Sequence, residues 1–125
     1  MKAALLVFIG GGLGSVLRYL IGRQFVNVSS SLFPLGTLTV NVLGSFLIGI
    51  ILGELLKNHS SNASLYLLFA TGFCGGFTTF SAFAFENFEL LKSGNTSGFL
   101  LYSFGSLLLG TLAVFGGIWL SKFFA

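Results

Sequence analysis

The sequence predicts an all-α integral membrane protein with four transmembrane helices, the third of them broken near its middle. Three observations predict this fold. Of the 125 residues, 54% are hydrophobic and only 7% are charged, whereas about a quarter of the residues are charged in an ordinary soluble domain. Four apolar segments are long enough to cross a hydrocarbon core, which takes roughly 20 helical residues. The third segment contains GFCGGFTTFSAF, residues 72–83, whose glycines and hydroxyl residues favour an interruption of the helix.

The four spans are predicted to form one membrane domain over the whole chain, residues 1–125. We expect helices over residues 3–22, 35–56, 65–91 and 99–122, with the break near residues 75–78. Pro34 stands where the second helix begins, a position that tolerates the missing N–H of proline. The apolar start has the composition of a signal peptide, but no small-residue cleavage site follows it. We therefore expect a first span that is retained.

The basic residues divide evenly between the two sides of the predicted membrane. One side carries Lys2, Lys57 and Lys122, and the other carries Arg18, Arg23 and Lys92. The positive-inside rule then gives the chain no preferred orientation. Two interpretations stay open: the chain inserts both ways and pairs as an antiparallel homodimer, or the balance is a coincidence in a short chain. Basic residues scattered in this way do not form a nucleic-acid surface, so we expect no nucleic-acid partner.

Polar side chains recur inside the predicted spans. Thr37, Asn41 and Ser45 stack on one face of the second helix, and Tyr102 and Ser106 have the same spacing in the fourth. Such groups either hold helices together by hydrogen bonds or line a path through the membrane. For Asn41, a carboxamide near the middle of a span, we favour a conduction path or a partner subunit.

The chemistry of this lining favours an anion. The three glutamates lie towards the ends of the segments, so we expect hydrogen-bond donors and aromatic rings in the lining but no buried carboxylate. Phe80 and Phe83 share a face after the break, and the edges of their rings carry positive partial charge. Packing alone also explains most of the phenylalanines.

The break itself suggests a cation site. Backbone carbonyls freed between residues 75 and 78 could bind a hard cation, as in the discontinuous helices of transporters. One chain supplies too few oxygens to replace the hydration shell of sodium, but a two-fold dimer doubles every ligand. A glycine kink without an ion is the alternative.

Three motifs in this order resemble the Fluc-type fluoride channels of bacteria. They are GGGLGSVLRY at residues 10–19, TLTVNVLGSFLIG at residues 37–49, and GFCGGFTTFSAF at residues 72–83. The resemblance implies a multi-pass protein of the bacterial cell membrane that forms antiparallel, dual-topology homodimers with two pores. It also implies passive, selective export of fluoride, which protects the cell, and a structural sodium ion between the subunits that is not transported.

The resemblance also implies roles for individual residues. Gly75 and Thr78 would bind sodium through their backbone carbonyls. The fluoride pore would be lined by Asn41, Phe80, Phe83, Tyr102, Ser106 and Thr37. Arg18 would draw anions into a vestibule, with Glu86 near a pore end. Some members have a further hydroxyl on the fourth helix where this chain has Gly110, so the path is either shorter here or uses water or Thr111.

Two other kinds of membrane protein match the size of the chain. A small multidrug exporter has the same number of spans, but the first span here lacks a deep carboxylate. A non-conducting helper subunit would also present a polar stripe to its partner. An enzyme is not expected, because the sequence has no nucleophile–base pair and no cluster of metal ligands; His59 is isolated in a polar stretch, and Cys74 is expected to pack.

Overall fold

The computed structural model describes residues 1–26, 33–57 and 62–123, and His59 therefore lies outside the described residues. Every described element is helical. The elements are α1 (Lys2–Phe25), α2 (Leu35–Lys57), α3 (Ala63–Leu65), the π-helix η1 (Tyr66–Cys74), α4 (Gly75–Phe77), α5 (Phe80–Lys92) and α6 (Thr96–Ser121). Four helical stretches are long and apolar enough to cross a membrane, with α3 to α5 forming the third, Ala63–Lys92. The all-α fold with four membrane-length helices is thus confirmed.

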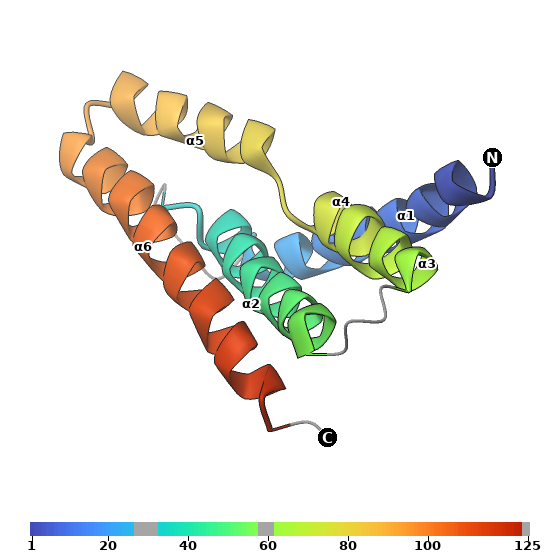
Figure 1. The fold of residues 1–125 in the computed structure, drawn as a ribbon. Coiled ribbons are helices and arrows are strands. Elements are labelled where there is room, and N and C mark those ends of the chain that lie inside the picture. The colour runs from blue at the N-terminus through green and yellow to red at the C-terminus, as the bar shows by residue number, and fades with distance from the viewer. Residues whose placement is uncertain (27–32, 58–61, 124–125) are drawn as a thin grey trace.

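The helices pack as two close pairs (Figure 1). The helix α2 lies along α6, and α1 lies along η1 and α4, with fewer contacts between the two pairs. The helix α5 leaves the end of α4 and reaches towards the start of α6, against which it packs (Figure 1). The polar residues of the second, third and fourth spans can therefore meet between α2, α5 and α6.

Glycines bring α1 and the third span together. A Cβ atom on Gly10 would lie 2.2 Å from the carbonyl oxygen of Leu68, and one on Gly14 would lie 2.2 Å from that of Phe73. From the other side, a Cβ on Gly76 would lie 2.3 Å from the oxygen of Gly11. Such distances leave no room for any side chain. These glycines are therefore packing positions, because small residues let helix backbones approach closely in lipid.

The same device joins α2 and α6. A Cβ on Gly49 would lie 2.3 Å from the oxygen of Val114, and one on Gly53 would lie 3.2 Å from the Cα of Ile118. These contacts advance by one turn along both helices in the same direction. The helices α2 and α6 are therefore parallel, in agreement with their colours in Figure 1.

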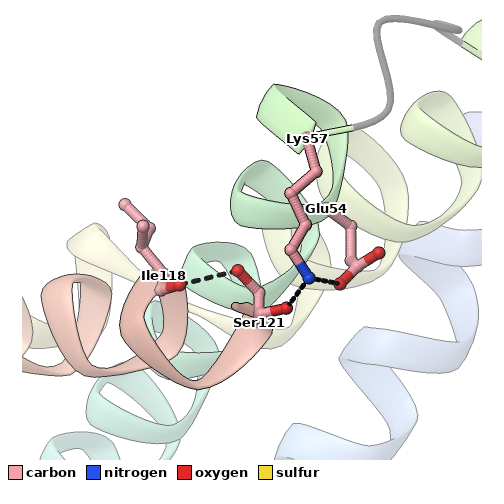
Figure 2. Close-up of polar contacts among 4 residues, drawn as sticks. All are labelled: Glu54, Lys57, Ile118 and Ser121. Atoms are coloured by element: carbon pink, nitrogen blue, oxygen red, sulfur yellow. Dashed lines mark hydrogen bonds and ion pairs between the residues drawn. The ribbon is translucent and has the colours of Figure 1, made fainter. Parts of the chain in front are cut away.

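The C-terminal ends of this pair are tied together by Lys57 (Figure 2). Its Nζ donates a hydrogen bond to the backbone carbonyl of Ser121 and lies 3.5 Å from Oε1 of Glu54. Ser121 is buried, and its hydroxyl donates to the carbonyl of Ile118 at 2.6 Å. A cation is favourable here because helix C-termini carry unpaired carbonyls and partial negative charge.

The third span changes backbone conformation after Phe77. Thr78 (φ −87°, ψ 159°) and Thr79 (φ −149°, ψ 122°) are extended, and α5 then starts at Phe80. The hydroxyl of Thr79 accepts a hydrogen bond from the backbone N–H of Ala82 at 3.2 Å and so caps the new helix. Two threonines therefore separate the helical stretches before and after them.

Candidate functional site

An open cavity of about 730 Å³ lies between α2, the third span and α6. Its lining brings together polar side chains, the glycine-rich turn before α5 and aromatic rings. Among the residues that line it are Asn41, Ser45, Gly75, Thr78, Phe80, Phe83 and Ser106. Six of these seven are candidate site residues from the sequence, and Ser45 joins them.

Asn41 holds the extended backbone of Thr79. Its Oδ1 accepts the backbone N–H of Thr79 at 2.9 Å, and its Nδ2 donates to the carbonyl of the same residue at 3.2 Å. Both backbone groups that leave the helix are thereby satisfied, which is necessary where lipid offers no partner. A carboxamide has two N–H groups, so this pairing leaves one for another acceptor.

In the described chain, some backbone carbonyls around Thr78 and Thr79 accept hydrogen bonds from outside the regular helices, and others do not. The oxygen of Cys74 accepts from the N–H and the hydroxyl of Thr78, at 3.0 and 2.9 Å. The oxygen of Gly76 accepts from Nε of Arg18 at 3.1 Å and from the hydroxyl of Ser15 at 3.4 Å. For Gly75 and Thr78, the two predicted sodium ligands, no hydrogen bond outside the regular helices involves the carbonyl oxygen within the described part of the chain.

A carboxylate lies among the predicted pore residues. Oε2 of Glu86 accepts the hydroxyl of Thr37 at 2.8 Å, and Oε1 accepts that of Tyr102 at 3.0 Å. The side chains come from α5, α2 and α6 respectively. Because a new helix begins at Phe80, Glu86 falls within its second turn and faces α2 and α6. Glu86 is half-buried and is not among the residues that line the two cavities.

The aromatic residues form a connected row next to this cluster. The ring centroids of Phe80 and Phe83 are 5.9 Å apart, and those of Phe83 and Tyr102 are 5.0 Å apart. Tyr102 is fully buried, whereas the side chain of Phe80 is 79% exposed in the single chain. The row therefore leads from the interior of the chain to its surface.

The hydroxyl of Ser106 is buried and unpaired in the described structure. Its Oγ is inaccessible to solvent and has no hydrogen-bond partner among the described residues. Leaving a buried hydroxyl unpaired costs about 1–3 kcal/mol. Ser106 is one of the residues that line the cavity, so an acceptor that enters there would lie near this unpaired hydroxyl.

Arg18 lines a second, smaller cavity of about 280 Å³ between α1 and α2. Arg23, Thr37 and Thr79 also line it. Thr79 borders both cavities, and Asn41 holds it from the side of the larger one. The two cavities are thus neighbours across the Asn41–Thr79 pair, with the arginines on one side and Ser106 on the other.

Three features were not predicted from the sequence. They are the pairing of Asn41 with Thr79, the place of Glu86 between two hydroxyls, and a bridge made by Asn87. The buried Asn87 donates to the carbonyl of Phe83 at 3.1 Å and accepts the hydroxyl of Ser103 at 2.9 Å. Its only signal in the sequence is an amide within an apolar stretch. Cys74 is buried, as expected of a packing residue.

The described residues contain no group of three or more histidine, cysteine, aspartate or glutamate side chains that could hold a metal ion. A cation at this site would therefore depend on backbone and hydroxyl oxygens, which suit hard cations. The polar lining offers hydrogen-bond donors from amide and hydroxyl groups, which suit an anion.

Comparison with known proteins identifies relatives along almost the whole chain. The model of the family described as CrcB-like protein, Camphor Resistance (CrcB), matches residues 5–118. A protein of Azobacteroides pseudotrichonymphae genomovar. CFP2, named fluoride-specific ion channel FluC, is 46% identical over 124 residues, or 99% of each chain. Proteins with the same name from Phocaeicola vulgatus and Gloeothece citriformis are 47% and 48% identical over 122 residues; the matches cover 98% of this chain and 100% and 98% of theirs.

These relatives are bacterial and are named as ion channels, not as enzymes. Together with four helices of membrane-spanning length, the matches show a multi-pass protein of the bacterial cell membrane and not an enzyme. The matched family model and the full-length identities lead to one conclusion: this chain belongs to the CrcB-like family, the Fluc-type channels.

Proposed function

We propose that the protein is a fluoride-selective channel that lets fluoride leave the cell passively and so lowers its toxicity. The observation that carries this proposal is the buried hydroxyl of Ser106, which has no hydrogen-bond partner among the described residues and belongs to a residue that lines the cavity between the spans. Relatives similar over their full length are named fluoride-specific ion channels. A small anion is a natural acceptor for such a donor.

Fluoride is small and strongly hydrated, so a selective path must replace its water with donors and still let it leave. Arg18 and the smaller cavity would attract the ion from solution. The free N–H of Asn41, the hydroxyl of Ser106 and the ring edges of Phe80 and Phe83 would then replace its water. A larger anion gains less from these donors, and this difference supplies the selectivity.

Thr37 and Tyr102 belong to this path under one condition. Both hydroxyls donate to Glu86, so each must leave the carboxylate before it can donate to fluoride. We therefore expect fluoride and Glu86 to compete for these two hydroxyls. This exchange would keep binding weak enough for the ion to pass on.

We further propose that the channel is an antiparallel homodimer with dual topology. The balanced basic residues support insertion in both orientations. The large exposure of Phe80 beside an open cavity supports a second copy that covers both. Two copies related by a two-fold axis would give two equivalent paths.

The break in the third span would hold a structural sodium ion at the centre of this dimer. The carbonyls of Gly75 and Thr78 fit the ion because they are hard oxygen ligands that make no hydrogen bond outside the regular helices in the described chain. Gly75 also leaves the site open, since a Cβ there would contact no other part of the described chain within 4 Å. Sodium would neutralise the facing carbonyls and join the two subunits.

The proposal is tested by anion efflux from liposomes loaded with potassium fluoride. A channel moves charge, so efflux should begin only when valinomycin lets potassium follow, and chloride-loaded liposomes should retain their anion. Liposomes without protein are the control. Fluoride efflux that needs no valinomycin would indicate a proton-coupled exporter instead, and no efflux from a folded protein would indicate a helper subunit.

Sodium is tested separately. Replacing it with a large organic cation throughout purification should weaken the dimer and stop fluoride efflux, and adding it back should restore both. A dimer that is equally stable and active without sodium would refute the sodium site and leave the channel proposal in place.

A further inference from the structure

The row of hydroxyl residues at four-residue spacing on α6 ends at Ser106. Tyr102 and Ser106 are one turn apart, and the next position in this row is Gly110, which has no side chain. Gly110 nevertheless lines the large cavity together with Ser106. A path that followed α6 alone would lack a donor at this end of the cavity.

The helix α2 has a hydroxyl beside this gap. A Cβ atom on Gly110 would lie 3.6 Å from Oγ of Ser45, which is its nearest contact with another helix in the described structure. Both residues line the cavity. Because α2 and α6 are parallel, Ser45 continues the row Thr37–Asn41 on α2 just where the row on α6 ends.

Thr111 does not fill the gap. Its hydroxyl is exposed and donates to the carbonyl of Leu107 on its own helix at 2.7 Å. It is absent from the residues that line the cavity. Among the described residues, Ser45 is the hydroxyl that lies against Gly110.

We propose that Ser45 takes the place of the missing α6 hydroxyl, so that the anion path passes from Ser106 on α6 to Ser45 on α2. This inference rests on the proposed fluoride path. The hydroxyl of Ser45 now donates to the carbonyl of Asn41 at 2.7 Å, a helix carbonyl with a second lone pair for the backbone N–H. Rotation about χ1 would exchange this neutral hydrogen bond for one to an anion, and charge-assisted bonds are roughly twice as strong.

The test compares fluoride efflux of four forms: wild type, Ser45→Ala, Gly110→Ser and the double variant Ser45→Ala/Gly110→Ser. Ser45→Ala should slow efflux by about tenfold, the usual effect of losing one hydrogen bond to a charged group. The double variant should regain most of the rate, because the new side chain has room at Gly110. Rescue by a hydroxyl on the other helix would not follow from a packing role.

Thr111→Val is the matched control, since it removes a hydroxyl from α6 outside the cavity and should conduct as the wild type does. Wild-type rates in Ser45→Ala would overturn the inference, as would a loss that Gly110→Ser does not repair or an equal loss in Thr111→Val. All of these results require a conducting wild type. A wild type that does not conduct would refute the proposed function instead, so the two failures are distinguishable.

Discussion

Replacing Asn41 with alanine removes the partner of two backbone groups at once. The N–H and C=O of Thr79 bond to Asn41 at 2.9 and 3.2 Å, and each would be left without a protein partner. An unsatisfied buried polar group costs about 1–3 kcal/mol, which gives about 2–6 kcal/mol for the pair. Because Thr79 borders two cavities, water can reach it, and we expect a value near the lower limit, about 2 kcal/mol.

The assay is the free energy of unfolding in mixed detergent micelles, with fluoride efflux measured on the same preparations. Asn41→Ala should lose stability by this amount and also lose fluoride efflux. Asn41→Asp keeps an acceptor for the N–H of Thr79, but it brings a charge into a membrane span and turns an oxygen towards the Thr79 carbonyl, so it should lose at least as much stability as Asn41→Ala and also abolish efflux. Asn87→Ala is the matched control, because it removes another buried carboxamide of the bundle and should affect stability more than efflux.

An Asn41→Ala variant as stable as the wild type would refute this reasoning. It would mean that the extended residues of the third span hold their conformation without the carboxamide. Full stability together with lost efflux would leave Asn41 a role in conduction alone.

Three further predictions follow from particular contacts. Gly76→Ala should destabilise the fold by about 1–3 kcal/mol, because its Cβ would lie 2.3 Å from the oxygen of Gly11. A Cβ on Gly75, by contrast, would contact no other part of the described chain within 4 Å. Loss of the dimer in Gly75→Ala, measured by light scattering, would show that a second copy covers this site, and an intact dimer would contradict it. Phe80→Ile should slow fluoride efflux and leave stability unchanged, since the ring is exposed in the single chain; unchanged efflux would remove it from the path. Glu86→Gln should cost about 1 kcal/mol of stability. The two oxygens of Glu86 accept one hydroxyl each, whereas the amide of glutamine has a single acceptor oxygen. A variant as stable as the wild type in chemical unfolding would contradict this prediction.

The sequence alone was sufficient to predict the four spans. Hydropathy predicts membrane-length helices because the bilayer fixes their length, and the third span begins and ends within two residues of the predicted range 65–91. Small residues at helix contacts in lipid let backbones approach closely, and Gly10, Gly49 and Gly76 each face a backbone that excludes a side chain.

The polar contacts of the site were harder to predict, because they depend on where the third helix is interrupted. The sequence indicated an interruption near residues 75–78, and the extended residues are Thr78 and Thr79. Asn41, a residue far away in the sequence, pairs with Thr79. The direction in which each side chain of α5 points depends on where this helix restarts after the interruption. The helical spacing of the residues before it therefore could not reveal that Glu86 faces α2 and α6.

The central claim is tested most directly by the reversal potential of the current in a planar bilayer containing the purified protein. With a tenfold gradient of fluoride and equal chloride on both sides, a fluoride-selective channel should reverse at about 59 mV, and changing the chloride gradient should not move this value. A reversal potential that follows chloride, or the absence of current from a folded and inserted protein, would contradict the account.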